Sequence, residues 1–408
     1  MNIEVPQNIV SLDKILPSEP LLMMGAGPVP IPARVAAANS IVINHVGNTM
    51  AQIIEQVKVM SRYVFQTASE HILGVAGPGS AAMEMAVVNL VIPGSTVLSI
   101  CNGFFSNRLS EMAERVDAKV IRHVVADGEN ADLDQVESLL RQHRPRVLTM
   151  VQGETSNTVH NRNLAEISAL ARSYECLVIV DAVCTLSTMP LDMDRWCVDA
   201  VITGGQKGLS SIPGVSLIAF SEQAWELIES RQDTLRHWCL DARLADQFWY
   251  KKSYHYTAPV SGILAMHEAL RLICYETLTT RFDRHLRCSV SMQAGIEAMG
   301  LKLYVPVACR LNSVVGIRLP ESVQADVLLN HMRRRYRVEI SGSFGPPIVR
   351  IGQMGEQSRS HNLFRTLHAL GSSMKRLGVE VDVPSGVAAL ESTLEDFDSD
   401  MQAVVEAP

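Results

Sequence analysis

Short runs of β-branched and aliphatic residues alternate with stretches of helical periodicity between about residues 70 and 220. Most of these runs are nearly continuous in apolar residues, which is typical of strands buried on both faces. The alternation predicts βαβ units that build a mostly parallel sheet covered by helices. The predicted strands are TVLSI (96–100), KVIRHVV (119–125), RVLTMVQ (146–152), CLVIVDA (176–182), DAVITG (199–204) and VSLIAF (215–220).

Several of these strands end directly on polar or glycine-containing turns. The turns are CNG after residue 100, GETSN after residue 152, Asp181 at the end of its strand, and GGQK after residue 203. In open α/β sheets, ligands bind beyond the carboxyl ends of the strands. We therefore expect these turns to line one crevice.

The pattern of the chain changes near residue 275. Beyond it, the periodicity predicts helices over about 278–299, 322–335 and 360–377, with strand-like segments at SVVGIRL and IVRIGQM. This mixture is typical of a smaller α+β domain. We predict an N-terminal arm over 1–20, a large domain over 21–275, a small domain over 276–378, and an acidic tail over 379–408 without chemistry of its own.

Composition narrows the classes of function. Hydrophobic residues make up 47% and charged residues 19% of the 408 residues, and no apolar run reaches the roughly 18 residues of a membrane span. The net charge is −7 and no cluster of Lys and Arg is interleaved with aromatic residues, so nucleic acid is not an expected partner. The N-terminus lacks the features of a secretion signal, and eight scattered cysteines without a C-x-x-C pair are typical of reduced thiols with no metal role. We expect a cytoplasmic globular enzyme.

Lys207 and Asp181 are the strongest candidates for chemistry. Lys207 lies in TGGQKGLSSIPG, a glycine-rich turn where partial burial would make its amine a nucleophile toward an aldehyde, although most loop lysines are simply solvated. Asp181 ends the apolar strand CLVIVDA. A carboxylate there can keep the pyridine nitrogen of pyridoxal phosphate (PLP) protonated, but it can equally cap a helix or bind a metal.

The segment GVAGPGSAAMEMAVVNL places a glycine turn directly before a helix of apolar periodicity. Free N–H groups and the positive end of the helix dipole then face one spot, which favours a phosphate. A dinucleotide loop is the alternative. The G-x-G-x-x-G spacing is missing, and no acidic residue follows about 20 positions on at the end of a second strand. We therefore expect a monophosphate.

The block DAVCTLSTMPLDMDRWCVDAVITGGQKGLSSIPGVSLIAFSEQAW strongly resembles the PLP-lysine block of class V aminotransferases, especially the alanine–glyoxylate and serine–pyruvate enzymes. The motifs MMGAGPVPIP, VAGPGSAAME, CNGFFSNR, GETSN, SYHYTAPVSGILAMHEAL and VRIGQMG occur in the family's order over about residues 20–375. The resemblance implies a PLP-dependent transferase of fold type I that works as a homodimer with active sites at the subunit interface. Its substrates would be a small amino acid and a small 2-oxo acid.

The resemblance assigns roles position by position. It implies that Lys207 carries PLP as an imine, that Asp181 pairs with the pyridine nitrogen, and that Arg350 clamps the substrate carboxylate. Phe105 would stack on the cofactor ring, and Gly27 would shape the substrate pocket. The positions that match further cofactor contacts are Gly79, Ser80 and Gln206 at the phosphate, Thr155 on the cofactor, and Tyr254 and Thr257, which would reach the phosphate of the neighbouring subunit.

Departures from the family pattern leave the substrate open. GAGP replaces the usual G-P-G-P, Asn44-His45 replaces a glycine-His pair, and GETSNTVHN differs from G-E-[ST]-S-T-G. Alternatives are ureidoglycine–glyoxylate and pyridoxamine–pyruvate aminotransferases, and a biosynthetic aminotransferase with an unusual substrate. A cysteine desulfurase is disfavoured because Gln206 stands where that family has His and residues 310–408 contain no Cys. A non-catalytic PLP-binding regulator would need an added DNA-binding domain, whereas only about 20 residues precede the core.

Overall fold

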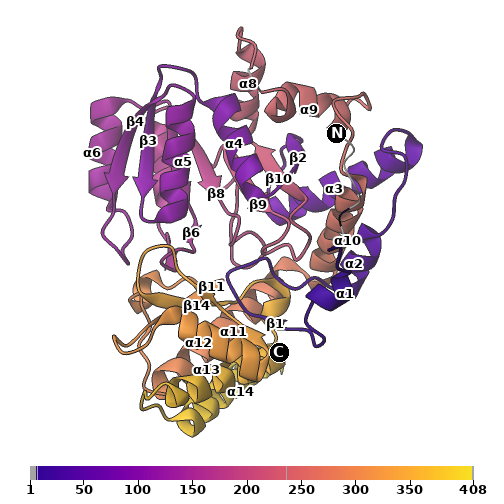
Figure 1. Ribbon diagram of the computed structural model, residues 1–408. Coiled ribbons are helices and arrows are strands. Elements are labelled where there is room, and N and C mark those ends of the chain that lie inside the picture. Colours follow the sequence, from indigo (N-terminus) through magenta and orange to yellow (C-terminus); the bar gives the residue numbers. More distant parts are fainter. Residues whose placement is uncertain (1–5, 7, 236, 407–408) are drawn as a thin grey trace.

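The computed structural model describes residues 6, 8–235 and 237–406, with side chains described as far as residue 397. The large domain contains a seven-stranded sheet of order β2-β10-β9-β8-β5-β3-β4 (Figure 1). Its strands are β2 (Ile72–Ala76), β3 (Thr96–Cys101), β4 (Lys119–Val124), β5 (Val147–Val151), β8 (Leu177–Asp181), β9 (Ala200–Gly204) and β10 (Val215–Phe220). β10 runs antiparallel to β9 and β2, and the remaining neighbours are parallel. The predicted α/β fold with a mostly parallel sheet is confirmed.

All six predicted strands form, and β2 is a strand that the sequence pattern did not predict. Its run ILGVA is interrupted by Gly74 and merges with the glycine turn that follows. The structure explains the glycine, because a Cβ at Gly74 would lie 2.0 Å from the ring of Trp249. The packing of Trp249 on the strand requires a glycine, and this glycine interrupts the apolar run from which the strand would have been predicted.

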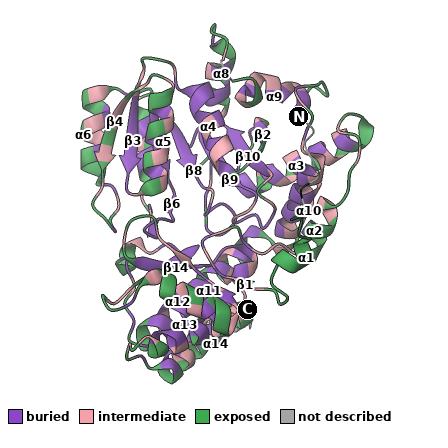
Figure 2. Cartoon of the chain, in the orientation of Figure 1, coloured by how far each residue is buried: buried purple, intermediate pink, exposed green. Residues whose placement is uncertain are grey.

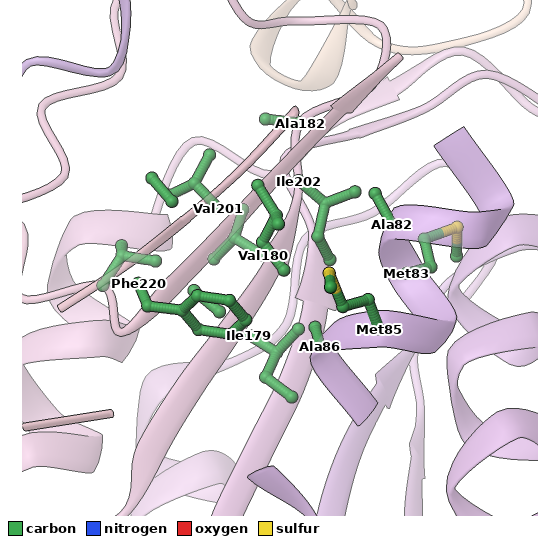
Figure 3. Close-up of a cluster of buried hydrophobic side chains, with 14 of the residues drawn as sticks. Ala82, Met83, Met85, Ala86, Ile179, Val180, Ala182, Val201, Ile202 and Phe220 are labelled. Carbon is green, nitrogen blue, oxygen red and sulfur yellow. The ribbon is translucent and has the colours of Figure 1, made fainter. Parts of the chain in front are cut away.

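Helices cover the central strands, whose residues in β5, β8, β9 and β10 are all buried. The helices of the large domain are α2 (Ala33–Asn39), α3 (Asn48–Phe65), α4 (Gly79–Leu90), α5 (Phe104–Arg115), α6 (Leu133–His143), α7 (Leu164–Ser173), α8 (Glu222–Ser230), α9 (Ala242–Trp249) and α10 (Val260–Glu276). Figure 3 shows Met85 and Ala86 of α4 against Val180 and Ile202 of the sheet. This packing fixes the N-terminus of α4 at the carboxyl ends of the strands.

The small domain combines a three-stranded sheet of order β11-β14-β13 with packed helices. Its elements are α11 (Leu278–Ala298), β11 (Val314–Arg318), α12 (Ala325–His331), β12 (Val338–Glu339), β13 (Ser341–Gly342), β14 (Ile348–Gly352), α13 (Ser360–Arg376) and α14 (Val383–Glu406). The predicted helix at 322–335 is shorter at its start and continues from α12 into a π-helical turn, Met332–Tyr336.

Two of the predicted domain limits need correction. The acidic tail over 379–408 is not separate, because Val383, Leu390 and Leu394 belong to the core of the small domain. α14 packs on α11 and α13, and its residues up to 397 include both buried and exposed positions, two classes that Figure 2 shows on the helices of this domain. At the other end, β1 (Leu22–Met23) pairs with β12, and Met24 is buried in the same core, so the chain passes through the small domain before it enters the large one.

Residues 8–20 of the predicted N-terminal arm carry one short helix, α1 (Leu12–Ile15), and are exposed along their whole length. No helix in the described part of the chain is both long and apolar enough to cross a membrane.

Candidate active site

Lys207 follows β9 and points toward the segment that enters from the small domain. Its ammonium donates a hydrogen bond to the carbonyl of Ala26. Gly27 has φ +97°, and a Cβ there would lie 2.6 Å from Lys207 Nζ, so only glycine leaves room for this lysine. Burial lowers the pKa of Lys207, with Arg350 adding to the effect and Cys184 and Asp181 opposing it. A lowered pKa leaves more neutral amine, which is the nucleophilic form.

Asp181 ends β8, beside β5 and β9, and only 7% of its surface is exposed. The pKa of its carboxyl is raised to about 6, chiefly by burial and also by Glu154, while the 2.8 Å hydrogen bond donated by the Val183 N–H and the charges of Lys207 and Arg108 act in the opposite direction. Few compensating partners surround this buried carboxylate. A cationic ring nitrogen would stabilise its charged form.

The N-terminus of α4 lies at the same edge of the sheet. No side chain caps it, and its first turn contains no acidic residue. A Cβ at Gly204 would lie 2.9 Å from Gln206 Oε1 and 3.4 Å from the Gly79 nitrogen, so the Gln206 amide lies beside this helix start. Gln206 Oε1 is buried and has no hydrogen-bond partner among the described residues. Gly79 also admits close packing, because a Cβ there would lie 2.7 Å from Val183.

Arg350 lies in the middle of β14, in the small domain, with 4% of its surface exposed. Its Nη1 donates to the Thr155 carbonyl at 2.6 Å and its Nε to the Gly342 carbonyl at 2.7 Å. Burial lowers its pKa to about 10, and Glu154 opposes the shift. No carboxylate in the described part of the chain pairs with Arg350, and its Nη2 donates no hydrogen bond there. A buried guanidinium with free donors is suited to binding a carboxylate.

The segment at residues 24–27 brings Lys207 and Arg350 together. The Gly352 N–H at the end of β14 donates to the Met24 carbonyl at 2.7 Å. The Ala26 N–H donates to the Ser341 hydroxyl at 3.0 Å, while the Ala26 carbonyl accepts from Lys207. The GAGP motif therefore connects the strand that carries the arginine to the turn that carries the lysine.

Phe105 is the second residue of α5. Its ring makes an edge contact with Phe104, at 5.3 Å between centroids, and lies 5.0 Å from the guanidinium carbon of Arg108. Its backbone N–H donates to the Glu154 carboxylate at 3.0 Å, and the Ser106 N–H donates to the same carboxylate at 2.9 Å. Glu154 is fully buried and caps the helix, which fixes where the Phe105 ring lies.

The structure brings most of the predicted site residues together and leaves two apart. Contacts or charge interactions connect nine of them: Lys207 with Gly27 and Asp181, Arg350 with Thr155, Gly79 with the neighbouring Gln206, and Ser80 with Phe105 through Arg108. Tyr254 and Thr257 are exposed, and Tyr254 has 60% of its surface in solvent, with its ring 5.8 Å from that of His45. Their predicted contact with a neighbouring subunit stays a prediction.

Sequence reasoning missed three residues that support the site. Glu154 stands in the quoted motif GETSN, but a glutamate in the turn after a predicted strand gives no sign that it will cap a distant helix. Val183 holds the Asp181 carboxylate through its N–H and packs against Gly79. Arg108 donates to Ser80 at 2.9 Å. The position of Arg108 in the motif CNGFFSNR, one turn beyond Phe105, was the available signal.

These features fit PLP. A lysine with a lowered pKa interacts with the charge of a buried carboxylate, and an uncapped helix start beside the Gln206 amide offers N–H groups to a phosphate. The fold and this arrangement define a fold-type-I transferase of the PLP-dependent kind.

Comparison with known proteins gives the family. A sequence model of the family Aminotransferase class-V matches residues 34–346. The alanine–glyoxylate aminotransferase of Oryctolagus cuniculus is 32% identical over 363 residues, which cover 87% of this chain and 92% of that protein. The chain therefore belongs to the class-V aminotransferases and is a transaminase, as the sequence motifs indicated.

Two crystal structures show the same fold over nearly the whole chain. The ureidoglycine–glyoxylate aminotransferase of Bacillus subtilis superposes with a TM-score of 0.90 at 28% identity, covering 93% of this chain and 99% of that one. The alanine–glyoxylate aminotransferase of Nostoc sp. gives a TM-score of 0.87 at 30% identity, covering 91% and 100%.

Proposed function

We propose that this protein uses PLP to move the amino group of a small amino acid, alanine or serine, to a small 2-oxo acid, glyoxylate or pyruvate. One observation carries the proposal: Lys207 lies directly against Gly27 and interacts with the charges of Asp181 and of Arg350, which comes from the other domain. The relatives named above act on glyoxylate, according to their names, which supports the choice of acceptor.

The residues that would hold the cofactor are Lys207 through a covalent bond, Asp181 at the ring nitrogen, and Gly79, Ser80 and Gln206 at the phosphate. When bound, PLP supplies an electron sink for the pair of electrons left at the substrate Cα. The charge on Asp181 favours the protonated ring nitrogen. Thr155 and Phe105 close the cofactor site from the side of α5.

Arg350 orients the substrate, and Lys207 moves its proton. The free Nη2 of Arg350 and the planar fork of its guanidinium suit a carboxylate, so the amino acid is held with its Cα beside the lysine. Lys207 Nζ takes the proton from Cα, because burial lowers its pKa toward the working range of a general base.

The aromatic residues beside Arg350 favour a substrate with a small, uncharged side chain. The Phe344 ring lies 5.5 Å from the guanidinium carbon of Arg350 and stacks on Phe104 at 5.0 Å between centroids. This stack joins the loop before β14 to the start of α5, so aromatic rings from both domains lie beside Arg350. A second carboxylate on the substrate would meet aromatic rings there.

We also propose a homodimer and a cytoplasmic location. Tyr254 and Thr257 are exposed, which supports contact with a second subunit. Apolar side chains along the arm, such as Ile9 and Leu12 with about 70% of their surface exposed, also need a partner surface. The eight cysteines are all free thiols, which supports a reducing compartment.

The test is a half-reaction screen of the purified PLP-loaded protein. Single amino acids are added without an acceptor, and the loss of the cofactor's visible absorbance is followed. Alanine or serine should react fastest, and glyoxylate or pyruvate should restore the spectrum. Borohydride should attach the cofactor to Lys207, as read by peptide mass spectrometry, in wild type and in the control Lys302→Ala, whose lysine is exposed.

Two outcomes would refute the proposal in different ways. If borohydride leaves no adduct on Lys207, this is not a PLP enzyme of the proposed kind. If the adduct forms but only ureidoglycine or pyridoxamine discharges the spectrum, the reaction is right and the substrate wrong.

A further inference from the structure

We call Gly79, Ser80 and Gln206, which lie at or beside the start of α4, the phosphate cradle. All three side chains are uncharged, and the residue before Gly79 is Pro78. A bound phosphate monoester carries between one and two negative charges at neutral pH. Helix N–H groups and the helix dipole offset only about half a charge. The cradle therefore needs a cation from elsewhere in the fold.

Lys207, Arg350 and Arg108 are three cationic side chains with a contact or charge interaction at this site. Lys207 is committed to the cofactor aldehyde, and Arg350 is tied to the Thr155 and Gly342 carbonyls on the substrate side. The third is Arg108, which lies one turn into α5, next to α4. Its charge also acts on Asp181, whose pKa it lowers, so it lies within electrostatic reach of the crevice.

The guanidinium of Arg108 contacts both parts of the expected cofactor site. Its Nη1 donates to Ser80 Oγ at 2.9 Å. Because that oxygen accepts the arginine proton, the hydroxyl's own hydrogen is free to point at an anion in the cradle. On its other side, the guanidinium carbon lies 5.0 Å from the Phe105 ring and 5.1 Å from the Phe104 ring. Arg108 thus spans the phosphate end and the ring face.

Arg108 has no acidic partner, although acidic residues are close. Glu84 and Glu111 line the same cavity of about 530 Å³ between α4 and α5. Neither comes within 4.0 Å of the guanidinium among the described residues, and Arg108 is only partly exposed. Arg108 is partly buried, pairs with neither of these carboxylates and donates to the cradle residue Ser80. This arrangement leaves its positive charge available to an anion that binds there.

We propose that Arg108 supplies the countercharge for the cofactor phosphate, acting with Ser80 at the start of α4. This inference rests on the proposed function, since it concerns the same cofactor. It adds a cation to a cradle that the sequence motifs describe as neutral. The competing explanation is structural, with Arg108 only bracing Phe104 and Phe105 through cation–π contacts.

The experiment compares two cofactor forms on apoprotein. PLP and pyridoxal, which lacks the phosphate, are titrated separately into wild type, Arg108→Gln, Arg108→Lys and the control Arg115→Gln, an exposed arginine of α5 that lines the same cavity. Binding is read from absorbance and from quenching of tryptophan fluorescence, without any turnover.

Arg108→Gln should weaken PLP binding by about tenfold or more, the loss expected for one charge-assisted contact, and leave pyridoxal binding unchanged. Arg108→Lys should recover part of the affinity for PLP, and Arg115→Gln should bind as wild type does. Added salt should weaken PLP binding to wild type more than to Arg108→Gln.

Other results would overturn the inference. Equal losses for PLP and pyridoxal would mean that Arg108 braces the aromatic rings, and no loss for either would mean that the charge does not act on the phosphate. A wild-type protein that binds neither form would instead refute the proposed function itself. A misfolded Arg108→Gln would show in its circular dichroism, and Arg108→Lys then decides between the two explanations.

Discussion

Replacing Asp181 by Asn should stabilise the cofactor-free protein at neutral pH. The carboxylate is buried, and its pKa rises to about 6, against about 3.9 for a free aspartate. Each unit of difference corresponds to about 1.4 kcal/mol, so the charged side chain costs the folded state on the order of 3 kcal/mol. Asn is uncharged and keeps an oxygen that can accept the Val183 N–H.

The gain should depend on pH in one direction. Below about pH 4, Asp181 is protonated in both the folded and the unfolded state, and the two proteins should be equally stable. Between about pH 4 and pH 6, the folded wild type binds more protons than the unfolded chain, so its stability falls as the pH rises. Above about pH 6 the full difference of roughly 3 kcal/mol should remain.

The assay is urea unfolding of both apoproteins at several pH values from 4 to 8, repeated with saturating PLP. PLP should stabilise wild type far more than Asp181→Asn, because only the carboxylate pairs with a protonated ring nitrogen. Asp199→Asn is the control, since Asp199 is also buried with a raised pKa but accepts from Val178 and Ser221 away from the crevice. An Asp181→Asn apoprotein that is no more stable than wild type at pH 8 would refute the reasoning.

Three further predictions test the site and the fold. Arg350→Lys should raise KM for the amino acid about tenfold by removing the planar fork, and an unchanged KM would remove Arg350 from the carboxylate site. Gly27→Ala should block attachment of PLP to Lys207, because the added methyl group would overlap the lysine side chain. The control Gly300→Ala has a similar φ of +89° but lies in open space, so it should strain only the backbone. Equal visible absorbance of the bound cofactor in both variants would contradict this prediction. Leu390→Ala should lower the free energy of unfolding by about 2–5 kcal/mol, and an unaffected protein would mean that α14 is peripheral.

Local sequence patterns were sufficient to predict a strand or a candidate site where the feature depends on one short segment alone. The apolar runs around Val180 and Ile202 predicted strands because both of their faces are buried. The GPGSA turn before an apolar helix indicated an anion site because a helix start exposes N–H groups whatever lies around it. The prediction of a separate acidic tail over 379–408 was wrong. It rested on the acidic residues of this segment, whereas apolar residues of α14 pack in the core of the small domain, next to α11.

The sequence by itself determined the alternation of strands and helices, the order of motifs, and the positions of Lys207, Asp181 and Arg350. Each element and each motif is recognised from residues within a few positions of one another, and the order of the motifs along the chain completes the family resemblance. Only the tertiary structure decided that residues 24–27 join the two domains, that Glu154 caps α5, and that Arg108 reaches Ser80. These contacts link segments that are far apart in the chain, so they exist only once the sheet and the helices have packed.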